Sequence, residues 1–304
     1  MASNLNAAKP GAGKLSGSLA AARAEGRAAL IGYLPAGFPT VDGGIRAVKA
    51  LIEGGCDVVE IGLPHSDPVL DGAVIQTADD IALRGGVRIK DVLRTVQEVA
   101  AAHPGTAVLV MTYWNPVDRY GAARFAADLA AAGGAGCILP DLPVEESEEW
   151  RKAADAHGLD TVFVVAPSSK DARLAEVTAA GSGFVYAAAV MGVTGTRSAV
   201  GSLAEDLVAR TRATTDLPVC VGLGVSDAAQ AAEVARFADG VIVGSAFVKR
   251  ILDAGDDEAA ALDAVRALAG ELVRRHPQRR LREHLPVQRL ALRRGAGHLG
   301  LAVV

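Results

Sequence analysis

Three carboxylates follow one another within a short segment of the chain. The sequence VVEIGLPHSDPVLDG (58–72) places Glu60 inside an apolar run, and Asp67 and Asp71 in the loop that follows it. Apolar surroundings raise the pKa of a carboxyl group towards values that suit proton transfer near neutral pH. The segment therefore predicts a site for acid–base chemistry, with Glu60 as its first candidate.

Each acidic residue of this kind also has a structural interpretation. Glu60 could pair with a basic neighbour inside the fold. Asp67 lies in Ser-Asp-Pro and Asp71 precedes a glycine, and both are common turn sequences. Asp141, at the end of a predicted strand, has the position of a site residue but could equally be structural, and His65 is expected to have no chemical role.

Eight short apolar runs must position these side chains. They are continuous rather than alternating, which is typical of parallel strands covered on both faces. Amphipathic helical segments lie between them, and a short extra helix is expected in 73–88. The predicted strands are 29–34, 57–63, 107–113, 136–141, 161–167, 183–190, 218–225 and 240–247, and the helices are 41–55, 89–103, 121–134, 145–158, 203–213 and 228–238.

About eight β-then-α units predict a (β/α)₈ TIM barrel, a parallel eight-stranded barrel with extra short helices. An open doubly wound sheet is the rival, but no GxGxxG follows the first strand. The predicted domain spans 18–275, after a flexible lead (1–17) and before a basic, unassigned tail (276–304). Functional residues of such barrels lie where the strands end, which places Glu60, Asp67 and Asp71 at one mouth.

Two glycine-rich turns predict a phosphate site. VGLGVS (221–226) and GSAF (244–247) follow the last two strands, where barrels often bind phosphate through backbone N–H groups and a helix N-terminus. Gly222, Gly224 and Gly244 would allow close approach, and Ser245 would add a hydroxyl, although each could be an ordinary turn residue. The Gly/Ser/Thr-rich loop 192–202 predicts either a mobile lid or a slack connection.

Composition excludes several classes of protein. The 304 residues are 50% hydrophobic with a net charge of −4, which argues against nucleic acid as a partner. The three cysteines, Cys56, Cys137 and Cys220, have no metal-ligand spacing and indicate a reducing compartment. No apolar run is long enough for a membrane span, so a cytoplasmic protein without membrane association is expected.

Several motifs together resemble the tryptophan synthase alpha chain family, in the order that this family has them. The sequences of these motifs are most similar to those expected of an actinobacterial member, and the resemblance covers roughly 18–275. The basic tail has no recognised counterpart, and His65 and Leu223 stand where the family often has Phe. The matching motifs are VVEIGLPHSDPVLDGAVIQ, YLPAGFPT, LPDLPVEES, GVTGTR, VGLGVS and VGSAFVK.

The resemblance implies a lyase of L-tryptophan biosynthesis. Such a subunit cleaves indole-3-glycerol phosphate to indole and D-glyceraldehyde 3-phosphate by a retro-aldol reaction, without a cofactor of its own. Its implied partner is a pyridoxal-phosphate beta chain in an alpha2beta2 heterotetramer. By the family match, Glu60 is the general acid–base and Asp71 accepts the indole N–H. The apolar strand favours a protonated Glu60, and the solvated loop an ionised Asp71.

Other positions are carried over from the family one by one. Tyr33 and Tyr186 match pocket aromatics, and Met111 matches an apolar wall beside the indole. Thr194 matches a lid residue that closes onto the loop acid. The phosphate shell would contain Gly195, Gly222, Leu223, Gly224, Gly244 and Ser245, and the beta-chain interface Asp67, Pro68 and Asn115.

Overall fold

Parallel strands form the centre of the computed structural model, which describes residues 13–189, 197–222 and 224–274. Every strand pairing is parallel, in the order β5-β4-β3-β2-β1-β9-β8-β7-β6. The strands are β1 (Ala29–Pro35), β2 (Val58–Gly62), β3 (Ala107–Met111), β4 (Gly136–Ile138), β5 (Asp160–Val162), β6 (Val164–Val165), β7 (Val185–Ala188), β8 (Val219–Gly222) and β9 (Gly240–Val243).

The strands at the two ends of this order, β5 and β6, follow each other directly in the chain. Only Phe163 separates β5 from β6, and its carbonyl accepts a hydrogen bond from the Tyr186 N–H at 3.0 Å. β5 pairs with β4 and β6 pairs with β7, so the two short strands occupy one place in the ring. The predicted eight-stranded barrel is confirmed, with its fifth strand interrupted once.

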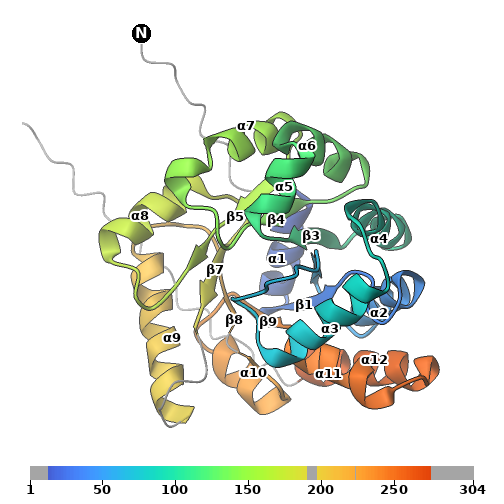
Figure 1. The fold of residues 1–304 in the computed structure, drawn as a ribbon. Helices are drawn as coiled ribbons and strands as arrows, with labels where there is room; N and C mark the ends of the chain where they lie inside the picture. Colours follow the sequence, from blue (N-terminus) through green and yellow to red (C-terminus); the bar gives the residue numbers. More distant parts are fainter. Residues whose placement is uncertain (1–12, 190–196, 223, 275–304) are drawn as a thin grey trace, which may run out of the picture.

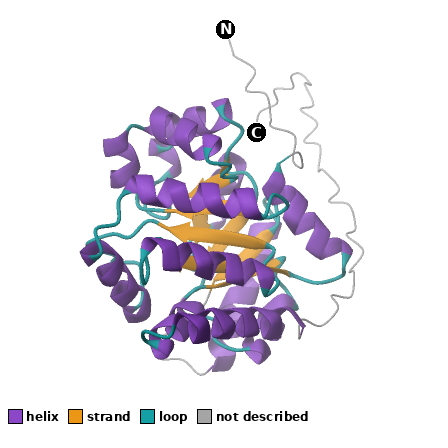
Figure 2. Ribbon diagram, turned by 90° about the vertical axis from the view of Figure 1, so that its right-hand side faces the viewer, coloured by secondary structure: helices purple, strands orange, loops and turns teal. Residues whose placement is uncertain are grey.

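Helices surround the ring of strands and cover its outer side (Figures 1 and 2). The extra helix expected in 73–88 is present as α3. The helices are α1 (Lys14–Ala24), α2 (Val41–Glu53), α3 (Ala73–Arg84), α4 (Ile89–Ala102), α5 (Trp114–Tyr120), α6 (Ala122–Ala131), η1 (Val144–Glu146), α7 (Glu148–Ala156), α8 (Asp171–Ala180), α9 (Arg197–Arg212), α10 (Ala228–Ala235), α11 (Ser245–Ala254) and α12 (Glu258–Arg274).

Several predicted boundaries are wrong because an apolar run continues past the end of its strand. β9 ends at Val243, whereas the run 240–247 was assigned to a strand throughout. Gly244 leaves the extended conformation, with φ −125° and ψ −72°, and α11 begins at the next residue. Phe247, Val248 and Ile251 are then buried at helical spacing. A second boundary differs for another reason: residues 197–202 of the predicted Gly/Ser/Thr-rich loop belong to α9.

Two hydrophobic layers hold the fold together. One lies between strands and helices, and the other fills the barrel interior and includes Leu15 and Leu19 of α1. The predicted lead, 1–17, therefore contains the start of a packed helix that contacts β1, β2 and β3. Gly183 makes room for this helix: its φ is +73°, and a Cβ there would lie 2.4 Å from Leu15 Cδ2.

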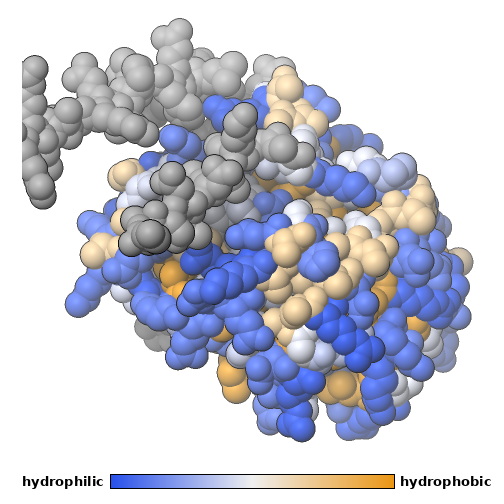
Figure 3. Space-filling model, turned by 90° about the horizontal axis from the view of Figure 1, so that it is seen from above, coloured by the Kyte–Doolittle hydropathy of each residue, from blue (hydrophilic) through white to orange (hydrophobic). Residues whose placement is uncertain are grey.

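The outer surface mixes hydrophilic residues with mildly hydrophobic ones, as the view in Figure 3 shows. Large hydrophobic side chains that are exposed in the described part of the chain are Val69, Leu70 and Leu203. Val69 and Leu70 adjoin each other in the loop that follows β2. None of the helices in the described ranges is both long and apolar enough to cross a membrane.

Candidate active site

Strand alternation decides which side chains face the inside of the barrel. In β2, Val58 belongs to the interior layer, whereas Val59 and Ile61 belong to the layer under the helices. Glu60 therefore faces the interior, because side chains two apart in a strand share a face. Its register neighbours are Tyr33 on β1 and Leu109 on β3.

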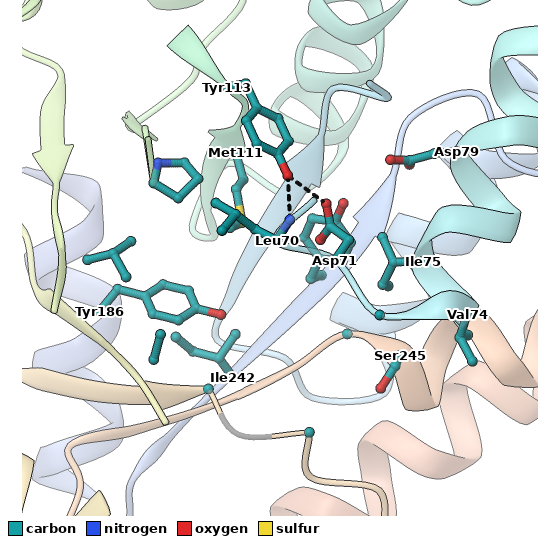
Figure 4. A pocket seen from close by; sticks show the side chains of 18 of the residues that line it. Leu70, Asp71, Val74, Ile75, Asp79, Met111, Tyr113, Tyr186, Ile242 and Ser245 are labelled. Carbon is teal, nitrogen blue, oxygen red and sulfur yellow. Dashed lines mark hydrogen bonds between the residues drawn. The ribbon is translucent and has the colours of Figure 1, made fainter. Parts of the chain in front are cut away.

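A cavity of about 710 Å³ opens at the carboxyl ends of the strands. β1, β3, β6, β7, β8 and β9 contribute to its wall, and the loop after β2 and the start of α3 close one side of it (Figure 4). The structure thus brings together side chains that are up to about two hundred positions apart. The predicted site residues that line it are Tyr33, Asp71, Met111, Tyr186, Gly222, Gly224, Gly244 and Ser245.

Glu60 lies in the wall beside this cavity rather than on its surface. Its side chain is 1% exposed, and neither carboxyl oxygen has a hydrogen-bond partner. Burial raises the pKa of Glu60 to about 8. Its charge acts on the phenols of Tyr33 and Tyr186, both of which line the cavity. The structural alternative, a pairing with a basic neighbour inside the barrel, is wrong for this residue.

Asp71 is held at the cavity rim by its neighbours. The Tyr113 hydroxyl accepts a hydrogen bond from the Leu70 N–H at 3.0 Å and donates one to Asp71 Oδ2 at 3.4 Å (Figure 4). The Gln76 side-chain amide donates to the Asp71 carbonyl at 2.8 Å. Asp71 was expected to be solvated, but it is half-buried, and burial raises its pKa against the opposing hydrogen bond from Tyr113.

The remainder of the loop is ordered by His65. Its ring lies 4.6 Å from that of Tyr113, centroid to centroid, and its Nδ1 accepts the Asp67 N–H at 3.1 Å. No chemical role was expected for His65, and these contacts give it a structural one. Asp67 and Asn115 are exposed and Pro68 is partly exposed, as a protein interface would require.

The glycines around the predicted phosphate site differ in what they do. Gly224 has φ +72° and open space where a side chain would point, so a ligand can approach its backbone. A Cβ on Gly222 would lie 2.5 Å from the Tyr186 hydroxyl, and one on Gly244 would lie 3.1 Å from the Tyr33 ring. These two glycines therefore also make room for the pocket tyrosines. Thr194, Gly195 and Leu223 lie outside the described residues.

Ser245 is the first residue of α11, a ten-residue helix whose N-terminus points at the cavity rim. Helix N-termini attract anions through their dipole and free N–H groups. Within the described ranges, no lysine or arginine lines the cavity. Lys249, further along α11, pairs with Asp253 at 2.8 Å on the exposed side of this helix.

Asp141 has a structural contact rather than a place in the cavity. Its carboxylate oxygens accept the Trp114 N–H at 2.8 and 3.1 Å, which caps the start of α5. A residue that the sequence analysis missed, Asp79 of α3, does line the cavity. Its position in ADDIA, a stretch of ordinary helical appearance, gave no signal of this. The described residues contain no group of three or more His, Cys, Asp or Glu that could hold a metal ion.

Comparison with known proteins identifies the family. The model of the family "Tryptophan synthase alpha chain" matches residues 19–276. The chain belongs to the tryptophan synthase alpha chain family. It is 78% identical to the alpha chain of Streptomyces avermitilis over 260 residues, which cover 86% of this chain and 93% of that one. The alpha chain of Thermobifida fusca is 60% identical over 257 residues, which cover 84% and 94%.

Solved structures agree with this assignment to the tryptophan synthase alpha chain family. Tryptophan synthase from M. tuberculosis, in its aminoacrylate-bound form, has a matching chain with TM-score 0.79 and 48% identity, covering 88% of this chain and all of that one. The alpha subunit from Legionella pneumophila matches with TM-score 0.80 and 30% identity, covering 87% of this chain and 98% of that one. The chain is accordingly a lyase of tryptophan biosynthesis that cleaves indole-3-glycerol phosphate to indole and D-glyceraldehyde 3-phosphate. The predicted actinobacterial resemblance is confirmed.

Proposed function

We propose that Glu60 transfers the protons of this cleavage and that Asp71 stabilises the charge that develops on the indole. The observation that carries the proposal is the buried Glu60 carboxyl, which has no partner and faces the barrel interior beside the cavity. A raised pKa of about 8 leaves most of this group protonated at neutral pH. Asp71 lines this cavity from the loop after β2.

The chemistry needs one proton delivered and one removed. Protonation of indole C3 by Glu60 breaks the aromaticity of the five-membered ring and leaves positive charge on the ring nitrogen. The Glu60 carboxylate then takes the proton of the glycerol hydroxyl next to the scissile bond. The C–C bond breaks, its electrons restore the indole ring, and the hydroxyl carbon becomes the aldehyde of glyceraldehyde 3-phosphate. Glu60 ends protonated, as it began, so no cofactor is required in this chain.

The two ends of the cavity suit the two ends of the substrate. Tyr33, Met111 and Tyr186 supply an apolar wall for the indole ring. Gly224, Gly244 and Ser245 surround the N-terminus of α11, where the phosphate would bind. We propose Thr194, Gly195 and Leu223 as further contacts from the family match alone, since the structure does not describe them.

Ser245→Ala should weaken binding of the phosphate-bearing substrate selectively. A hydrogen bond to a charged group contributes enough that its loss should raise the KM for indole-3-glycerol phosphate about ten- to a hundredfold. Binding of the phosphate-free analogue indole-propanol should change little. Ser226→Ala is the matched control, because its exposed hydroxyl already contacts Gln230 at 3.1 Å. Equal weakening of both ligands would place the phosphate elsewhere.

A beta chain carrying pyridoxal phosphate is the proposed partner, in an alpha2beta2 heterotetramer located in the cytoplasm. The loop after β2 supports this, because Asp71 faces the cavity while Val69 and Leu70 are 81% and 61% exposed. Apolar side chains exposed in this way favour a protein interface. Asp67, Pro68 and Asn115 would lie in the same interface.

The proposed function is tested by indole release from indole-3-glycerol phosphate, with and without the beta chain. Partner binding that fixes the loop should position Asp71, so turnover should rise by more than about tenfold, or about 1.4 kcal/mol of barrier. Mixing the two chains and measuring indole by fluorescence would show this. Turnover that the beta chain leaves unchanged would contradict the proposed interface, and wild-type turnover in a folded Glu60→Gln protein would contradict the proposed role of Glu60.

A further inference from the structure

Asp79 is a third carboxyl at the cavity, and the reaction as derived above does not use it. It lies on the face of α3 that is buried against the barrel, with Ile75, Ala78 and Ala82. Its side chain is 3% exposed, and Oδ1 has no hydrogen-bond partner. The next residue, Asp80, is on the exposed face and pairs with Arg84 at 2.9 Å. A buried acid without an ion pair is costly and calls for an explanation.

The surroundings of Asp79 belong to the loop that carries Asp71. Figure 4 shows the Asp79 carboxyl pointing from α3 towards the side on which Asp71 and Tyr113 lie. The charge of Asp71 and the backbone N–H of His65 both act on this carboxyl, and the charge of Asp79 in turn acts on the Tyr33 phenol of β1. Asp79 thus interacts with the loop after β2 at two places, at His65 near its start and at Asp71 near its end.

Other elements packed on α3 add little charge at this place. α11 also contacts α3, but its Lys249 and Asp253 pair with each other at 2.8 Å on the exposed side. Apart from burial, the charge of Asp71 is what raises the pKa of Asp79. Two carboxyl groups that line one cavity and interact electrostatically resist ionising together, so a proton on one of them leaves the other free to remain charged.

We propose that Asp79 is a positioning residue for Asp71, holding the loop after β2 through His65 and keeping the proton that allows Asp71 to stay ionised. This inference rests on the role proposed above for Asp71. Burial raises the pKa of Asp79 to about 7, with Asp71 acting in the same direction and the His65 N–H in the opposite one. Near neutral pH the proton thus resides on Asp79 for much of the time.

Two replacements of Asp79 should distinguish the effect of its side-chain shape on turnover from the effect of its charge. Asp79→Asn keeps the size and the hydrogen-bonding atoms of the neutral acid, so kcat near pH 7 should stay within about twofold. Asp79→Leu removes both, and the displaced loop should lower kcat by about ten- to a hundredfold with little change in KM. Asp80→Asn is the matched control and should leave turnover unchanged. Equal turnover in Asp79→Leu and Asp80→Asn would overturn the proposal.

The pH profile gives a readout that a merely structural role would not move. Ionisation of Asp79 above about pH 7 adds a second negative charge beside Asp71 and should lower turnover. In Asp79→Asn only the Glu60 titration, near 8, remains on the alkaline side. The alkaline decline should therefore shift upward in this variant but not in Asp80→Asn. An unshifted profile would show that Asp79 does not act through its charge and would overturn the proposal.

A double-mutant cycle separates this inference from the proposed function. If Asp79 acts through Asp71, then Asp79→Leu should lower kcat by less than about twofold in an Asp71→Asn background. If the kcat losses of the two single variants multiply in the double variant, Asp79 acts independently of Asp71. That outcome overturns the inference, while Asp71 keeps its role. Near-wild-type turnover in Asp71→Asn alone would overturn the proposed role of Asp71 and with it the inference. Circular dichroism of each variant checks that the barrel is folded.

Discussion

Glu60→Gln should abolish indole formation while leaving the barrel intact. Loss of a general acid–base costs about 10²–10⁴ in rate, and here one group serves two proton transfers, so the loss should reach the upper end of that range. Glutamine has nearly the same size and stays uncharged, so packing beside Tyr33 and Leu109 is preserved. The measurement is steady-state indole release with and without beta chain.

The same substitution should change stability in a pH-dependent manner. The pKa of Glu60 is about 8 in the folded protein against an ordinary 4.5, so between these values the folded state binds more protons than the unfolded state. The unfolding free energy of the wild type therefore falls as pH rises through this window, by up to about 1.4 kcal/mol per pH unit. Glu60→Gln lacks this titration and should become more stable than the wild type towards the alkaline end.

Urea denaturation of both proteins at mildly acidic and mildly alkaline pH would measure this difference. Glu53→Gln is a suitable control, because Glu53 is an exposed glutamate paired with Arg266 at 2.7 Å. Its effect on stability should be small at both pH values. A stability difference for Glu60→Gln that does not vary with pH would mean that the Glu60 carboxyl titrates normally and is not the buried acid described here.

The role of Glu60 could be anticipated because strand geometry is local. An acid inside a continuous apolar run must face either the barrel interior or the helices, and near the strand end the interior meets the mouth. The partial burial of Asp71 was not foreseeable in this way. It depends on Tyr113, which comes from the end of a different strand, and on the fold that brings the two together.

The residues that were missed or misjudged depend on long-range contacts too. α5 contains an Asn-Pro pair that suggests a turn, yet Asp141 from another loop caps its first residue. Asp79 and Asp80 are adjacent acids in one helix, and only the packing of α3 against the barrel distinguishes the buried one from the exposed one. Periodicity in the sequence predicted that α3 exists but not which of its polar residues faces the cavity.

Asp71→Asn should be the second most damaging substitution at the site. Removing one preorganised group that stabilises developing charge typically costs about 10²–10³ in kcat. Asparagine can still accept the indole N–H, but it carries no negative charge to offset the positive ring nitrogen. The loss should therefore appear mainly in kcat, with a smaller change in KM, and it should persist when the beta chain is added.

The comparison with Tyr113→Phe tests whether charge or loop position matters more. That variant removes the hydroxyl that joins Leu70 N–H and Asp71 Oδ2 but keeps the carboxylate. Its turnover should fall by about tenfold or less, the effect of one neutral hydrogen bond. A larger loss in Tyr113→Phe than in Asp71→Asn would mean that the loop's position, rather than the charge of Asp71, limits the reaction. Asp71→Asn should lose more turnover than Tyr113→Phe, because the Asp71 carboxylate contacts the substrate directly, whereas the Tyr113 phenol only holds that carboxylate in place.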